Sequence, residues 1–130
     1  MKKNELFAAV LMFLATIGMV IGIFAYEKSR AKGYYTVELI ARAPLNGNWY
    51  PSKFTVPFGQ EVRIRIRNIE TVSHGFALPD FHIEPAINEI KAGEVKEVKF
   101  LADKRGTFPF LCTVWCSNEH LRMNGEITVE

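Results

Sequence analysis

Residues 61–68 read EVRIRIRN, a stretch in which apolar and charged residues alternate strictly. Valine and isoleucine occupy positions 62, 64 and 66, whereas arginine occupies positions 63, 65 and 67. Because successive side chains of a β-strand point to opposite faces, the pattern predicts a strand with one buried face and one face in solvent.

Further strands are predicted on both sides of this stretch, in residues 34–42, 54–56, 94–103, 106–112 and 125–130. The short segment 54–56 follows a loop rich in proline and glycine and is expected at a sheet edge. In 94–103 the alternation slips by one residue between Val95 and Val98, which predicts a β-bulge. Short strands separated by turns, without a convincing helix, predict a compact all-β Greek-key sandwich or barrel in residues 34–130.

The amino-terminal part of the chain has a different character. Residues 6–25, LFAAVLMFLATIGMVIGIFA, contain no charge and no proline. At a rise of about 1.5 Å per residue, such a helix crosses a hydrocarbon core of about 30 Å. The run is longer than the apolar region of a signal peptide, and no clean cleavage site follows it. We therefore predict a retained membrane anchor and linker in residues 1–33, with a signal peptide as the alternative.

Small residues on this helix recur at steps of three and four, at Ala15, Gly18, Gly22 and Ala25. They share one face, where a helix of a larger membrane subunit can approach closely. The alternative is that glycine and alanine are simply common in membrane helices.

The charge of the β-rich part argues against a nucleic-acid partner. The whole chain of 130 residues has a formal net charge of +2, but residues 34–130 contain 11 Lys plus Arg against 12 Asp plus Glu. This part has no basic stripe of the kind that binds nucleic acid. It also shows no nucleophile triad, phosphate loop or carboxylate pair.

The two cysteines of the chain, Cys112 and Cys116, lie close to His120 and Met123 in the stretch FPFLCTVWCSNEHLRMNGEITVE. Alone, the cysteines are compatible with a disulfide, with buried free thiols or with a redox-active pair. Thiolate, imidazole and thioether together are the donor set that selects copper.

A copper site of this kind needs a second histidine from elsewhere in the fold. The stretch TVSHGFALPDF supplies His74 on a different loop, and in a β-barrel an early loop and a late loop can meet at one end. Gly75 and Gly125 are expected to allow the close turns that this requires. A mononuclear site of Cys116, His120, Met123 and His74 remains an alternative.

The spacing C-x3-C-x3-H-x2-M, with SHGF upstream, resembles the binuclear CuA site of cupredoxin domains. Such domains occur in cytochrome c oxidase subunit II and at the C-terminus of nitrous oxide reductase. The resemblance extends from YPSKFTVPFGQEV to HLRMNGEITV. It implies two coppers bridged by Cys112 and Cys116. His74 and Met123 would complete one copper, and His120 with the backbone carbonyl of Val114 the other.

Some positions depart from the mitochondrial-type subunits. Those proteins have a magnesium-binding glutamate where this chain has Val114, so no magnesium role is implied. They also usually have two membrane helices, whereas this chain shows one, as some bacterial oxidases do. Trp49 and Tyr50 are candidates for electron entry, with ordinary packing or an exposed position in a loop as the alternatives. Arg122 is a candidate for docking, and His82 is expected to be a surface residue.

The resemblance implies a function without bond-making chemistry of its own. The chain would be an electron-transfer subunit that accepts electrons from cytochrome c and passes them to a haem-containing membrane subunit of a terminal oxidase. It would be anchored in the cell membrane, with the cupredoxin domain on the periplasmic, extracytoplasmic side. The alternatives are a free-standing tethered copper carrier, towards which SHGFALP and VWC lean, or a copper-delivery protein.

Overall fold

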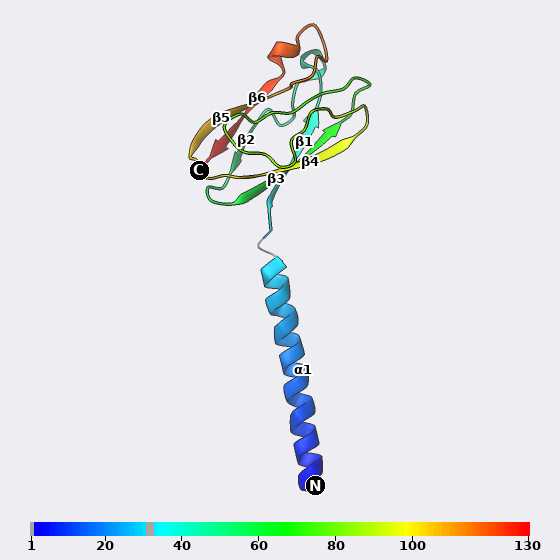
Figure 1. The fold of residues 1–130 in the computed structure, drawn as a ribbon, viewed down its shortest axis with the longest axis vertical. Coiled ribbons are helices and arrows are strands. Elements are labelled where there is room, and N and C mark those ends of the chain that lie inside the picture. The colour runs from blue at the N-terminus through cyan, green and yellow to red at the C-terminus, as the bar shows by residue number, and fades with distance from the viewer. Residues whose placement is uncertain (1, 31–32) are drawn as a thin grey trace. The chain divides into compact units, whose positions relative to one another are not determined.

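A computed structural model describes residues 2–30 and 33–130, and the chain divides into two compact units, Met1–Gly33 and Tyr34–Glu130 (Figure 1). Residues 1, 31 and 32 of the predicted anchor and linker lie outside the described residues. The first unit contains the helix α1, Lys3–Arg30, which includes the predicted apolar core 6–25. Its segment Lys3–Glu27, with a mean hydropathy of 2.6, is long and apolar enough to cross a membrane.

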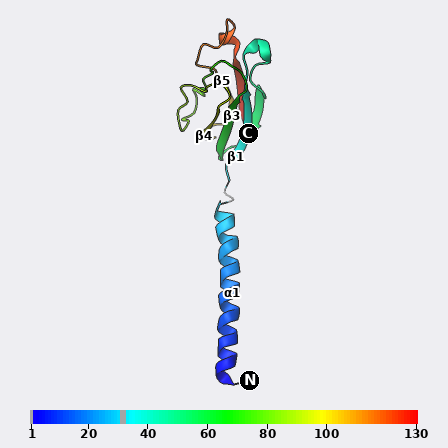
Figure 2. The same ribbon diagram turned by 90° about the vertical axis from the view of Figure 1, so that its right-hand side faces the viewer.

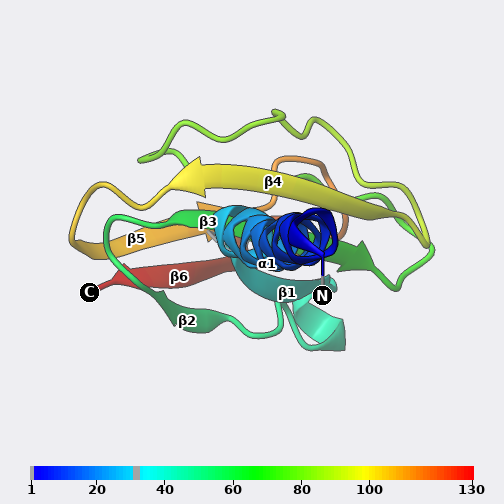
Figure 3. The ribbon, with the colours of Figure 1, turned by 90° about the horizontal axis from the view of Figure 1, so that it is seen from below.

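The second unit consists of two three-stranded sheets, one ordered β1-β3-β4 and the other β2-β6-β5. Figure 2 shows β1, β3 and β4 of the first sheet close together. The strands are β1 (Tyr35–Ala41), β2 (Lys53–Val56), β3 (Glu61–Asn68), β4 (Val95–Leu101), β5 (Gly106–Leu111) and β6 (Asn124–Val129). β1 pairs with β3 in parallel and β2 with β6 in parallel, whereas β3–β4 and β5–β6 are antiparallel. Figure 3 shows β2, β6 and β5 side by side, with the predicted short strand β2 at the edge.

The alternating strand β3 behaves as its sequence predicts. Val62, Ile64 and Ile66 are fully buried, and they pack in one apolar core with residues of the facing sheet such as Phe110 and Ile127. Burying an aliphatic side chain of this size contributes about 1.5–3 kcal/mol. The arginines of β3 lie on the outer face, where Arg65 pairs with Glu38 at 2.8 Å and with Glu97 at 3.2 Å.

The predicted bulge in the fourth strand is wrong. β4 pairs with β3 in a continuous register from Arg67↔Val95 to Glu61↔Leu101. Val98 and Phe100 point into the core, while Val95 is a partly exposed apolar residue at the start of the strand. One apolar side chain on the outer face produced the apparent slip, without an extra residue in the ladder.

The connection between β3 and β4, residues 69–94, contains His74 and Ala77, which both form isolated β-bridges. His74 forms an antiparallel bridge with Ile90 inside this connection. Three residues later Ala77 bridges to Leu111, the last residue of β5, with both N–H groups donating to the opposite carbonyls at 2.9 and 3.0 Å. This bridge brings His74 beside the residue that follows β5, Cys112.

Helical structure within residues 33–130 is limited to two 3-10 turns, η1 (Pro44–Asn46) and η2 (His120–Arg122). Both lie in loops at the ends of strands, which agrees with the predicted absence of a helix in this part. η2 lies in the loop between β5 and β6, and its last residue is followed by Met123.

Candidate metal centre

The loop between β5 and β6 begins at Cys112 and ends at Met123. The backbone N–H of Cys112 donates to the carbonyl of Met123 at 3.1 Å, so the two ends of the loop are tied together. Both side chains are nearly inaccessible, at 4% and 1% exposure, and both belong to the apolar core. Because both ends of the loop are anchored in the core, the residues between them form a loop closed at its base.

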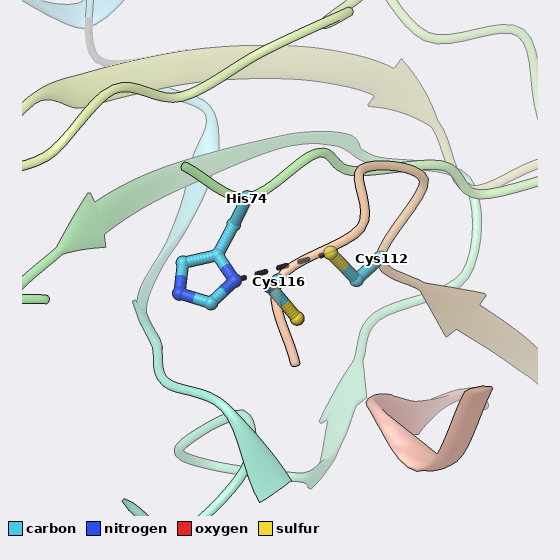
Figure 4. A group of neighbouring side chains, drawn as sticks. All are labelled: His74, Cys112 and Cys116. Carbon is cyan, nitrogen blue, oxygen red and sulfur yellow. Dashed lines mark hydrogen bonds between the residues drawn. The ribbon is translucent and has the colours of Figure 1, made fainter. Parts of the chain in front are cut away.

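The side chain of His74, from the connection between β3 and β4, points towards Cys112 at the start of this loop (Figure 4). Its ring is fully buried, and its Nδ1 atom lies 3.9 Å from Sγ of Cys112. One ligand atom from each of His74, Cys112 and Cys116 falls within 4.8 Å of the others, which is a geometry that can hold a metal ion. Both thiols are free, so the structure forms no disulfide between them.

Each of the remaining predicted ligands lies close to one of the two cysteine sulfurs. Sγ of Cys116 lies 3.7 Å from Nδ1 of His120 and 3.6 Å from Sδ of Met123. The carbonyl oxygen of Val114 lies 3.2 Å from Sγ of Cys112. The structure therefore brings together all six donors proposed from the sequence, although His74 is far from the others along the chain.

The sequence predicts close turns at Gly75 and Gly125, but the structure shows close approaches of other segments at both positions, and Gly125 lies within β6. A Cβ atom on Gly75 would collide with Oγ1 of Thr113, and the Gly75 N–H donates to Sγ of Cys112 at 3.4 Å. A Cβ atom on Gly125 would collide with the ring of Phe110 and with the carbonyl of Ser52. In both places glycine is required by the close approach of another segment.

Glu70 is a polar residue of the site that the sequence pattern does not reveal. Its Oε2 atom lies 2.8 Å from Nε2 of His74, and its side chain is only 11% exposed. Burial raises the pKa of Glu70, but hydrogen bonds, first from Asn46 and then from the Ala43 N–H, outweigh it and hold the pKa below its usual value. A glutamate four residues before a histidine is a weak signal outside a helix, so only the folded loop reveals this contact.

The pKa values of the acidic and basic groups at the site follow from burial and from neighbouring groups. Burial lowers the pKa of His74, but its contacts with Cys112 and Glu70 raise it more, so the pKa lies above its usual value. Burial raises the pKa of Cys112, but the hydrogen bonds with His74 and the Gly75 N–H lower it overall. Burial and then the nearby charge of Cys112 raise the pKa of Cys116 to about 11. Sulfur and imidazole donors gathered in this way fit copper better than Mg²⁺ or Ca²⁺.

The site is most accessible on the side of Cys116 and His120, which are both half-buried. Cys116 and Glu70 line a surface pocket of about 390 Å³. Next to it, the ring of Trp115 is 68% exposed and its centroid lies 5.8 Å from that of His120.

The two candidate entry aromatics occupy different environments. Trp49 is 1% exposed, packs edge-to-face against Phe76 and Phe110, and donates its indole N–H to the carbonyl of Met123 at 3.4 Å. The burial of Trp49 matches the packing alternative, because its ring packs in the core and contacts the end of the loop between β5 and β6. Tyr50 is exposed.

The two remaining predicted residues are at the surface. Arg122 is exposed and pairs with Glu119 at 2.8 Å. His82 is exposed as expected and pairs with Glu84 at 3.0 Å, outside the metal cluster.

Comparison with known proteins agrees with this geometry. Residues 12–129 match the model of the cupredoxin-like domain. Nitrous-oxide reductase of Ralstonia nicotianae is 35% identical over 98 residues, which are 73% of this chain but only 14% of that enzyme. The chain therefore corresponds to a small part of that relative.

Two solved structures show the same fold. The periplasmic domain of subunit II of cytochrome oxidase from Bradyrhizobium japonicum matches with a TM-score of 0.60 and 22% identity, over 74% of this chain and 83% of that one. A chain of a heme-copper terminal oxidase dimer matches with a TM-score of 0.61 and 19% identity, over 98% of both chains. The match over residues 12–129, together with the sandwich and its buried sulfur and imidazole cluster, shows that this chain belongs to the family of cupredoxin-like domains.

Proposed function

We propose that this chain is the membrane-anchored electron-transfer subunit of a terminal oxidase, with a binuclear copper centre of the CuA type. The observation that carries the proposal is the meeting of His74 with Cys112 and Cys116, whose ligand atoms lie within 4.8 Å of one another. Cys112 and Cys116 would be shared by the two coppers. His74, His120, Met123 and the carbonyl of Val114 would complete the ligand set.

The protein's contribution is to hold these ligands in place. When bound, a copper pair of this kind takes up and releases one electron without making or breaking bonds in a substrate. His74 is held by its backbone bridge to Ile90, with hydrogen bonds of 3.1 and 2.7 Å. Cys112 and Met123 are held by the core at the ends of β5 and β6. Ligands fixed in this way move little when the charge of the site changes, and a small rearrangement favours fast electron transfer.

We assign the partners on the same basis. The domain would accept electrons from cytochrome c and deliver them to a haem-containing membrane subunit. α1 would anchor the chain by a single pass, with the β-sandwich on the periplasmic side. The match over 98% of both chains with a component of a heme-copper terminal oxidase supports this architecture. The exposed Tyr50 and Arg122 are available for docking, whereas the buried Trp49 does not reach a partner directly.

The test is a copper count and an electron paramagnetic resonance spectrum of the full chain in detergent. We expect two coppers per chain, a purple colour and a hyperfine pattern of one electron shared by both coppers. One copper per chain with the spectrum of a mononuclear blue site would refute the binuclear centre.

A free-standing, membrane-tethered copper carrier is the second candidate. The 35% identity to part of nitrous-oxide reductase favours it. Purification in mild detergent distinguishes the two, because an oxidase subunit brings a haem-bearing subunit with it and a carrier is isolated alone. A copper-delivery protein would instead hold labile Cu(I) without a redox-cycling chromophore.

A further inference from the structure

The carboxylate of Glu70 joins a proposed metal ligand to a surface loop. Its Oε2 atom lies 2.8 Å from Nε2 of His74 and accepts a hydrogen bond of 2.7 Å from the backbone N–H of Ala43. Its Oε1 atom accepts a hydrogen bond from the side-chain amide of Asn46, the last residue of η1. The two oxygens therefore bind one ring nitrogen and two donors from the loop of η1.

The backbone around Glu70 is fixed as well. Its own N–H donates to Oδ1 of Asn68 at 2.9 Å, and the Asn68 side chain is almost completely buried. The Asn68 amide donates to the carbonyls of Val72 and Ile90 at 2.7 and 3.0 Å. Ile90 is also the bridge partner of His74. Carboxylate and imidazole are thus held by one hydrogen-bonded frame, so their contact does not depend on a mobile side chain.

The contact determines which ring nitrogen of His74 faces the sulfurs. A neutral imidazole has one N–H donor and one acceptor nitrogen, and an ionised carboxylate is only an acceptor. The proton therefore belongs on Nε2, towards Glu70, and the lone pair of Nδ1 is directed towards Cys112. Carboxylates that hold a metal-binding histidine in this way orient the ring and make the ligand more basic.

We propose that Glu70 is a positioning residue of the metal centre, which fixes the tautomer and orientation of His74 and lowers the reduction potential. The inference rests on the proposed function, because it requires His74 to bind copper through Nδ1. The carboxylate is partly shielded from water, so its negative charge stabilises the oxidised, more positive state of the centre. Through Asn46, the loop of η1 supports this carboxylate.

The chain contains a matched control for this pair. His82 and Glu84 form the same imidazole–carboxylate contact at 3.0 Å, but their side chains are 86% and 75% exposed. Solvent screens such a surface pair, and it lies outside the cluster of proposed ligands. Glu84→Gln therefore makes the same chemical change as Glu70→Gln without touching the centre.

The experiment compares Glu70→Gln, Asn46→Ala and Glu84→Gln in the full chain in detergent. With copper bound, we expect Glu70→Gln to raise the reduction potential and to weaken copper affinity about 10-fold or more in competition with a chelator. Asn46→Ala removes one of three hydrogen bonds and shifts the potential in the same direction by a smaller amount. Glu84→Gln leaves both quantities unchanged.

The same variants are studied in the reduced copper-loaded protein and in the metal-free protein by nitrogen-15 NMR of the histidine rings. We expect a slowly exchanging Nε2–H on His74 that exchanges faster in Glu70→Gln. The proposal is overturned if Glu70→Gln leaves the potential and this exchange unchanged, or if Glu84→Gln shifts the potential as much. If Glu70→Gln does not fold, Asn46→Ala decides, and an unchanged potential in that variant overturns the proposal.

The two proposals fail in different ways. Two coppers in the wild type with an unchanged potential in both site variants leaves the proposed function intact and removes the role of Glu70. A wild type without a binuclear centre removes the proposed function and, with it, the role of Glu70 in tuning a potential. In that case the metal-free NMR measurement still reports whether Glu70 holds the His74 ring.

Discussion

The replacement Gly75→Ala tests how the ligand loop is supported. A Cβ atom at this position would collide with Oγ1 of Thr113 and would lie 3.1 Å from both Cγ2 and the backbone nitrogen of Val114. Extra atoms in a packed site cost about 1–3 kcal/mol. We expect Gly75→Ala to destabilise the domain by this amount and to displace the segment that follows Cys112.

A second substitution, Thr113→Ala, tests the contact between the added Cβ atom and Oγ1 of Thr113. Thr113 is exposed, so Thr113→Ala alone is expected to change the free energy of unfolding by less than about 0.5 kcal/mol. In the double variant the Oγ1 atom is absent, but the two contacts with Val114 remain. Thr113→Ala should therefore recover part of the loss caused by Gly75→Ala, with a coupling of about 0.5–2 kcal/mol in the double-mutant cycle.

The assay is denaturant unfolding of the metal-free chain in detergent, followed by tryptophan fluorescence. Trp49 is buried beside the loop, so its fluorescence changes when the domain unfolds. Trp115 is exposed in the folded domain, so its fluorescence gives a nearly constant background. The copper-loaded variant should show a changed resonance spectrum, because the Gly75 N–H that donates to Cys112 moves. The reasoning would be refuted if Gly75→Ala had the same free energy of unfolding as the wild type. It would also be refuted if Thr113→Ala restored none of the loss in the double variant.

Four further predictions concern the centre and the core. Cys112→Ser should abolish the shared-electron spectrum, because one bridge is lost; a surviving pattern would show that Cys112 is not a bridge. Removing copper with a strong chelator should lower the melting temperature measured by calorimetry, because the metal binds only the folded arrangement of ligands; equal melting temperatures of both forms would contradict this. Ile64→Ala should cost about 2–5 kcal/mol in denaturant unfolding, because the side chain is fully buried. Arg65→Ala should cost about 1 kcal/mol or less, because its ion pairs are partly exposed; similar losses in both variants would be inconsistent with this burial pattern.

Most of the candidate ligand set could be predicted because it is local. Cys112, Cys116, His120 and Met123 lie within one loop, so their spacing alone indicates a common site. His74 was predicted by its resemblance to a family motif and by the need for a second histidine. Its position beside Cys112 depends on the bridge between Ala77 and Leu111, a contact between segments far apart in sequence.

The residues that sequence analysis misjudged or missed depend on such distant contacts. Val95 suggested a bulge, but the register with β3 is continuous and leaves this side chain on the outer face. Trp49 is compatible in sequence with an exposed loop, but in the fold it is buried against Phe76 and Phe110 and donates to the carbonyl of Met123. Glu70 showed no recognisable pattern, because its partners His74, Ala43 and Asn46 meet it only in the folded state.

Local sequence patterns are thus sufficient to predict the strands, the apolar helix and the chemistry of the donor set. Alternation and uninterrupted apolar length are properties of neighbouring residues, and they govern burial wherever a segment is placed. Only the folded chain shows which distant segments share a hydrogen bond. These hydrogen bonds establish which nitrogen of His74 faces the sulfurs and which carboxylate holds the ring. Such contacts form only when the sheets pair and the core packs, because that pairing sets the register that brings them within reach.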